Sequence, residues 1–117
     1  MQQEPPLYNL DNLSSFGDKD NGLAREIITI FLEQLPAYIT ALTEGCSNKD
    51  WKAVAFTAHK LKSNIRLFNI SRALDDILQI ESDAKNLSNL DQVNDKIVRV
   101  MAILQRVEQE MQQAIQK

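Results

Sequence analysis

The 117-residue sequence is poor in residues that cross-link, coordinate or interrupt a fold, with one cysteine, one histidine, three glycines and three prolines. Cys46 has no second cysteine for an intrachain disulfide and no companions at metal-ligand spacing. A single histidine cannot supply the three or four donors of a stable metal centre. The chain also lacks a glycine-rich phosphate loop and a Walker lysine motif. We therefore expect no metal, no cofactor and no ATP-binding site on this chain.

Long hydrophobic runs are absent too, since none approaches the roughly 20 residues that span a bilayer. Residues 1–6 form a polar, proline-containing leader without the basic and apolar regions of a signal peptide. The net charge of −3 argues against a nucleic-acid binder, which needs a basic surface. These features predict a cytoplasmic protein with a single domain over residues 7–117. The starting methionine and the polar leader favour a free-standing protein over the alternative, a fragment of a larger one.

Apolar residues recur at intervals of three and four along almost the whole chain, which is the spacing of amphipathic α-helices. A short element over residues 7–16 precedes a loop in which Asp20 or Asn21 is suited to cap the next helix. We expect that helix to continue through a kink at Pro36. Its predicted core stripe consists of Leu23, Ile27, Ile30, Phe31, Tyr38 and Leu42.

Turn signals divide the rest of the chain into three further helices. Gly45 and the polar residues after it predict a turn, with Ser47 or Asn48 capping the second long helix. Asn69 is suited to a left-handed helix end and Ser71 to capping a third helix over about residues 71–85. The last helix carries a heptad-like seam of Val93, Ile97, Val100, Leu104, Val107 and Met111.

Helices joined by short turns must alternate in direction if each is to bury its stripe against its neighbours in sequence. The predicted fold class is therefore all-α, an antiparallel up-down four-helix bundle with a short extra N-terminal helix. Because the last seam has three other amphipathic helices to pack against within the chain, we expect a monomer.

A helical wheel of the second long helix separates a core stripe from a surface that carries the only histidine. His59 lies well round the helix from the stripe, with Phe56, Lys62 and Ser63 beside it at three or four residues' distance. The sequence therefore predicts an exposed imidazole. The stripe itself consists of Trp51, Val54, Ala55, Ala58, Leu61 and Ile65.

The same region concentrates positive charge. Residues 51–74 contain no acidic residue, so they carry +5 while the rest of the chain carries −8. Such a patch attracts an anion or an acidic partner surface, although a solvated helix face with chance charges is the alternative interpretation. The basic residues are Lys52, Lys60, Lys62, Arg66 and Arg72.

An isolated exposed histidine suits few kinds of chemistry. A hydrolytic base needs a nucleophile and an orienting carboxylate in a pocket, and we expect neither an acidic neighbour of His59 nor a pocket on a slender bundle. A neutral imidazole can itself attack a phosphoryl group, and the Lys62 ammonium one turn away would stabilise the charge of the product. The residues present therefore favour a histidine that becomes phosphorylated.

The stretch Ala58-His59-Lys60-Leu61-Lys62-Ser63, followed by Leu67-Phe68-Asn69-Ile70, resembles the signature of histidine-containing phosphotransfer (HPt) domains. The resemblance extends to residues 31–36, to the Asp50-Trp51 pair and to the long final helix. Ser63 and Asn69 depart from it, since many members have glycine at these positions. The resemblance implies a phosphorelay intermediate of two-component signalling, a phosphocarrier rather than an enzyme with kinase activity of its own.

Applied to this chain, the resemblance makes His59 the phosphoacceptor, which takes a phosphoryl group from one receiver-domain aspartate and passes it to another. Lys62 becomes the phosphate-stabilising cation. The implied partners are receiver domains of hybrid histidine kinases and response regulators, with Mg²⁺ expected on the receiver. The alternative function is a non-catalytic helical adaptor that binds an acidic protein through the same basic face. The residues assigned to partner docking are Phe56, Lys60, Ser63, Arg66 and Lys52.

Overall fold

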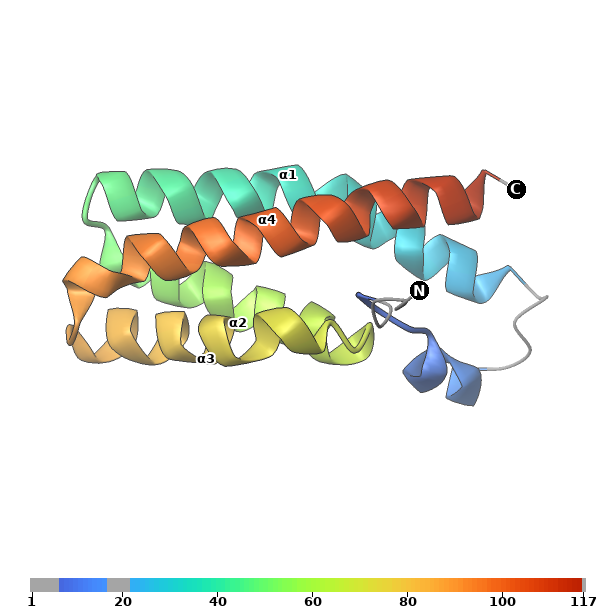
Figure 1. The fold of residues 1–117 in the computed structure, drawn as a ribbon, viewed down its shortest axis with the longest axis horizontal. Helices are drawn as coiled ribbons and strands as arrows, with labels where there is room; N and C mark the ends of the chain where they lie inside the picture. The colour runs from blue at the N-terminus through green and yellow to red at the C-terminus, as the bar shows by residue number, and fades with distance from the viewer. Residues whose placement is uncertain (1–6, 17–21, 117) are drawn as a thin grey trace, which may run out of the picture.

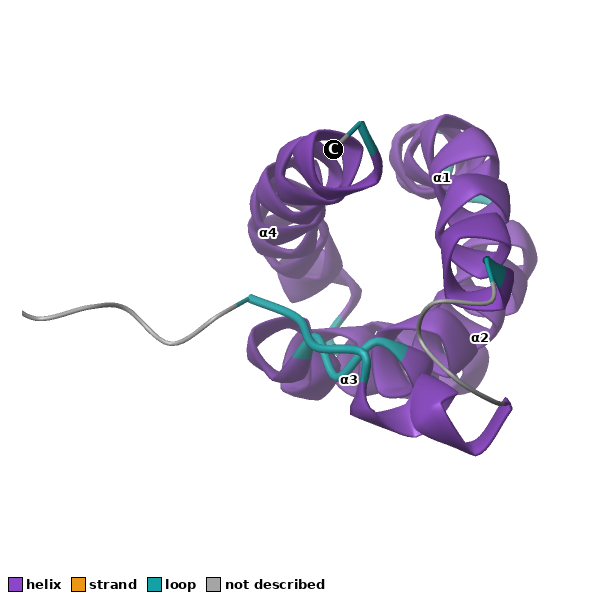
Figure 2. Cartoon of the chain, turned by 90° about the vertical axis from the view of Figure 1, so that its right-hand side faces the viewer, coloured by secondary structure: helices purple, strands orange, loops and turns teal. Residues whose placement is uncertain are grey.

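The computed structural model of the chain describes residues 7–16 and 22–116, which form one 3-10 helix and four α-helices (Figure 1). Consecutive α-helices run antiparallel, and Figure 2 shows them arranged around a common interior. The predicted all-α bundle is therefore confirmed. No helix in these described ranges is long and apolar enough to cross a membrane. The elements are η1 (Asp11–Phe16), α1 (Leu23–Ser47), α2 (Trp51–Leu67), α3 (Ser71–Asn86) and α4 (Leu90–Ile115).

One hydrophobic core runs the length of the bundle. Within α2, the residues Val54, Ala58, Leu61 and Ile65 are buried, so this helix turns one fixed face inward. Each large aliphatic side chain buried in this way contributes about 1.5–3 kcal/mol relative to an exposed one. The predicted seam of α4 is confirmed in full, since all six of its residues are buried: Val93, Ile97, Val100, Leu104, Val107 and Met111.

The stripe predicted for α1 is partly wrong. Phe31 and Leu42 are buried as expected, but the Ile30 side chain is 53% exposed. Ile28 and Leu35 are buried instead, and together these four buried residues follow spacings of 3, 4 and 7, which keep them on one face of the helix. Consecutive residues lie about 100° apart on a helix, so Ile30 and Phe31 cannot both point to the same core. The apolar pair in the sequence does not reveal which of the two faces inward.

Helix α1 continues through Pro36, as predicted. Figure 1 shows the first part of α1 inclined to the rest, in keeping with the kink expected at an internal proline. At its start, Gly22 occupies the N-cap position with a left-handed backbone, φ 85°. The capping residues predicted there, Asp20 and Asn21, lie outside the described residues.

The cap of α2 differs from the prediction. Its N-cap is Asp50, whose carboxylate accepts a hydrogen bond from the backbone N–H of Ala53 at 3.2 Å. Ser47 is still the last residue of α1 and Asn48 is the C-cap of that helix, because Gly45 does not end it. Every residue from Ser47 to Asp50 except the lysine is a good cap, so the sequence alone does not select one.

The turn between α2 and α3 contains Asn69 with φ 53°, which confirms the predicted left-handed helix end. Ile70, rather than Ser71, is the N-cap of α3, and no side chain caps that helix start. Residues 7–16 pack against this end of the bundle, where Leu13 is buried and the Asn12 amide donates to a carbonyl oxygen in the last turn of α2 at 2.9 Å. The predicted short N-terminal helix is thus present, in 3-10 form.

Candidate functional site

Helix α2 presents its histidine to solvent. The side chain of His59 is 63% exposed and that of Phe56 is 62% exposed, so both predictions of exposure are confirmed. This placement follows from the buried face of the same helix, because Ala58 and Leu61 on either side of the histidine point into the core. Packing therefore fixes the direction in which the imidazole leaves the helix.

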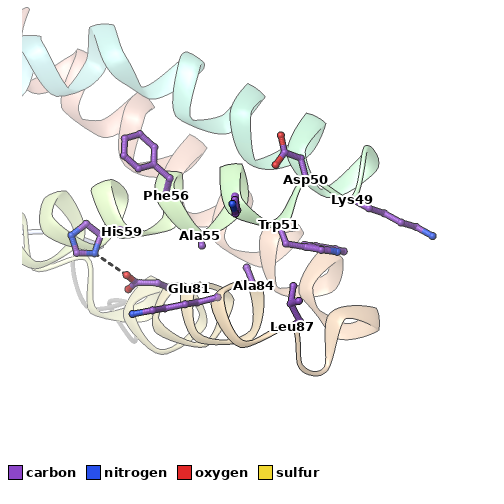
Figure 3. A pocket seen from close by; sticks show the side chains of 11 residues that line it. Lys49, Asp50, Trp51, Ala55, Phe56, His59, Glu81, Ala84 and Leu87 are labelled. Atoms are coloured by element: carbon purple, nitrogen blue, oxygen red, sulfur yellow. Dashed lines mark hydrogen bonds and ion pairs between the residues drawn. The ribbon is translucent and has the colours of Figure 1, made fainter.

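An acidic residue of α3 binds the imidazole directly. Glu81 Oε2 lies 2.8 Å from His59 Nδ1, and its other oxygen, Oε1, lies 2.8 Å from Lys62 Nζ (Figure 3 draws the histidine contact). The expectation that no acidic group neighbours the histidine is therefore wrong. The error arises because Glu81 lies 22 residues further along the chain and reaches the site only through packing of α3 against α2.

The charge state of Glu81 decides the roles of the two imidazole nitrogens. The hydrogen bond from Lys62, and secondarily that from His59, lowers the pKa of Glu81 despite partial burial. An ionised carboxylate only accepts hydrogen bonds, so the proton in the 2.8 Å contact belongs to Nδ1 of the histidine. In the neutral imidazole, Nε2 then carries the lone pair and is the nucleophilic atom.

The basic patch is smaller than the sequence suggests, because Lys62 is paired with Glu81 and only 19% of its side chain is exposed. Lys60 packs over the ring of Phe56, with its Nζ 4.4 Å from the ring centroid, in a cation–π contact. The other predicted docking residues, Lys52, Ser63 and Arg66, are exposed, and their positions 7, 4 and 7 residues from His59 place them on the same face of α2 as the histidine. Lys52 borders a groove beside His59, whereas Arg66 lies two turns along the helix from it.

A groove of about 760 Å³ runs between α2 and α3 and has His59 at one end (Figure 3). Small side chains, Ala55 of α2 and Ala84 of α3, make its base, and Trp51 is half-buried along it. Trp51 and Ala55 pack against the core as predicted, but they are only partly buried, and the expectation that the bundle has no pocket was wrong. Both residues lie at the edge of the apolar stripe, where a wheel cannot separate core from groove.

The groove does not turn His59 into a hydrolytic base. Although an orienting carboxylate is present, the described residues that line the groove include no serine, threonine or cysteine to act as a nucleophile. Within residues 7–16 and 22–116, no group of three or more potential ligands among His, Cys, Asp and Glu could hold a metal ion. The nucleophile that the site offers is the imidazole itself.

The chain is an antiparallel helical bundle with one exposed imidazole bound to a carboxylate. Comparison with protein families identifies the class of protein to which this arrangement belongs. The family model described as Hpt domain matches residues 26–117, and the chain belongs to this family. Neither the curated proteins nor the solved structures contained a match. Hpt membership implies a phosphotransfer role in two-component signalling, as a phosphocarrier that interacts with receiver domains.

Proposed function

We propose that the chain is a phosphorelay intermediate whose phosphoacceptor atom is Nε2 of His59. The observation that carries the proposal is the 2.8 Å bond between Nδ1 and an ionised carboxylate, which in the neutral imidazole leaves the lone pair on Nε2 of a side chain that is 63% exposed. In the first transfer, the N–P bond forms as the P–O bond of a receiver's aspartyl phosphate breaks, and the aspartate carboxylate leaves. In the second transfer, another receiver's aspartate attacks phosphorus and the N–P bond breaks.

Glu81 acts as a positioning residue in this proposal. Its bond to Nδ1 holds the ring in one tautomer and one orientation, and it stabilises the positive charge that the ring acquires as Nε2 attacks. Lys62 shares the same carboxylate, so its ammonium is held within one helical turn of the imidazole. From there it stabilises the phosphoryl oxygens after transfer.

The convex site accounts for the need for a protein partner. An imidazole that is 63% exposed on a helix surface can enter a concave active site on a receiver domain, which supplies the aspartate and its Mg²⁺. In-line transfer requires alignment and charge neutralisation rather than covalent assistance. We propose residues 7–117 as the single domain that performs this role, as a monomer.

The test is phosphotransfer profiling against receiver domains from the same organism, with His59→Gln as the matched variant. We expect the wild type to acquire acid-labile phosphate from at least one phosphorylated receiver, and His59→Gln to acquire none with unchanged helical content. The alternative, a helical adaptor, predicts binding to a receiver without any phosphate transfer. Phosphate acquired equally by His59→Gln would place the acceptor on another residue.

A further inference from the structure

The C-cap of α3 is a leucine in an unfavourable conformation. Leu87 has φ 55° and ψ 42°, the left-handed region that favours glycine and, after it, asparagine at a helix end. The described residues contain three other non-glycine residues with positive φ: Lys49, Asn69 and Asn89. Leu87 is thus the one apolar member of this set, and a bulky side chain there adds strain to the turn.

The Leu87 side chain contributes little packing to the fold. It is 65% exposed, the largest exposed fraction among the described large hydrophobic residues, and it packs neither within the core nor against it. Its backbone N–H closes the helix end on Asp83 O, a bond that glycine makes equally well. Because the strained backbone at Leu87 is not compensated by packing of its side chain, we look for a role of this side chain in binding rather than in folding.

The position of Leu87 suggests that role. It lines the same groove as His59, and Figure 3 shows it at the opposite end from His59 and Phe56. The two exposed hydrophobic residues, Phe56 and Leu87, therefore flank the groove, whose base is made of alanines. Three lysines, Lys49, Lys52 and Lys85, line the groove as well, and they outnumber its two carboxylates, Asp50 and Glu81.

We propose that Leu87 is an anchor for the receiver domain, which covers the groove from His59 to the α3–α4 turn. This inference rests on the proposed function, because the receiver that places its aspartate at His59 must lie against the adjoining groove. An exposed apolar surface bordered by polar side chains is typical of a protein-interaction site. The lysines fit a partner surface that combines an apolar patch with acidic side chains, as expected next to an aspartate-rich phosphorylation site.

The proposal predicts opposite effects of Leu87→Gly on stability and on binding. Relief of the left-handed strain should raise Tm by about 2–5 °C, while loss of the anchor should weaken receiver binding about five- to tenfold. Leu87→Met keeps an apolar side chain and should keep the wild-type affinity. Val98→Ala is the matched control, because Val98 is 56% exposed on α4 and does not line the groove.

Affinity is measured by calorimetry with the unphosphorylated receiver domain that binds the wild type most tightly in a panel from the same organism. Unchanged affinity for Leu87→Gly, or an equal loss for Val98→Ala, would overturn the anchor. A lower Tm for Leu87→Gly would overturn the strain argument. If Leu87→Gly abolishes self-association of the chain but leaves receiver affinity unchanged, the groove binds a second copy instead and the proposal is wrong.

Failure of the Leu87 anchor and failure of the proposed phosphorelay function give different results. If the wild type acquires no phosphate on His59, the relay fails, yet receiver affinity still reports on Leu87. If the wild type acquires phosphate and Leu87→Gly does so with the same KM for the phosphorylated receiver, the anchor fails and the relay stands.

Discussion

Replacement of Glu81 by alanine is the sharpest test of how the site works. The change removes both the acceptor for His59 Nδ1 and the partner of Lys62, each at 2.8 Å. A hydrogen bond to a charged group contributes about 1.5–3 kcal/mol when shielded, but the imidazole is 63% exposed. We therefore use a lower value of about 1 kcal/mol, which corresponds to a loss of about fivefold in the rate of transfer to His59.

The same substitution should not shorten the lifetime of the phosphorylated form. Without Glu81, Lys62 loses its carboxylate partner and its ammonium is available to the phosphoryl oxygens. Transfer rate and phosphohistidine lifetime should therefore respond differently, with the rate falling and the lifetime unchanged or longer. Rapid-quench transfer from a phosphorylated receiver measures the first, and decay of purified phosphoprotein measures the second.

Nitrogen chemical shifts of His59 provide an independent readout of the tautomer. In the wild type, we expect the neutral ring to carry its proton on Nδ1, and in Glu81→Ala a mixture weighted toward Nε2–H, as in free imidazole side chains. A wild-type transfer rate in Glu81→Ala, together with an unchanged tautomer, would refute the positioning role. Loss of helical content would attribute the effect to folding instead.

The depressed pKa of Glu81 adds a pH dependence with a defined sign. Because the folded-state pKa lies below the unfolded value, the ion pairs stabilise the fold above about pH 4.3 and this contribution is lost as pH falls through the folded pKa. Glu81→Gln cannot titrate, so the stability difference between wild type and variant should shrink as pH falls below about 4.3 and passes through the folded-state pKa. Urea unfolding across this range measures the difference, and a constant gap would contradict the assignment.

Three further substitutions and one control test the transfer site and the packing of the fold. Lys62→Ala should shorten phosphohistidine lifetime about tenfold, whereas Arg99→Ala, which breaks an α3–α4 ion pair of 2.9 Å away from the histidine, should not; equal lifetimes would reduce Lys62 to diffuse steering. Ser63→Trp should slow transfer about a hundredfold in a folded protein, because it holds the receiver's aspartate away from the imidazole; unchanged kinetics would mean approach from another side. Gly45→Ala should lower the free energy of unfolding by about 1 kcal/mol in urea titrations. The new Cβ would lie 2.9 Å from Val54 Cγ2, and this crowding outweighs the gain in helix propensity. A more stable variant would show that Val54 moves at little cost.

The spacing of apolar residues predicted the fold, because each helix buries one face and that face can be identified from the sequence of the helix alone. The seam of α4 repeats at three- and four-residue intervals without interruption, and every member is buried. The same reasoning failed at Ile30, because Ile30 and Phe31 are adjacent apolar residues and only one of them can face the core. It also failed at the turn before α2, where several residues suited to capping follow one another.

Only the part of the site that lies on a single helix could be predicted from the sequence. His59, Phe56 and Lys62 lie on α2, so a wheel placed them together on its surface. Glu81 belongs to α3, and its contact with His59 depends on the relative rotation and register of two packed helices, which no periodicity reports. The groove has the same origin, since it exists because alanines of two different helices face each other.

The two faces of α2 separate stability from transfer. Its core residues Val54, Ala58, Leu61 and Ile65 are at most 1% exposed, and they pack the helix against α1 and α3. The transfer residues project from the other side, where most of their contacts are with solvent or with Glu81 of α3. Substitutions at His59 and Phe56 therefore remove little buried area and leave the core intact. Glu81 is the exception, because it joins α3 to both His59 and Lys62, so its removal alone should change the site's chemistry and the contact between the two helices together.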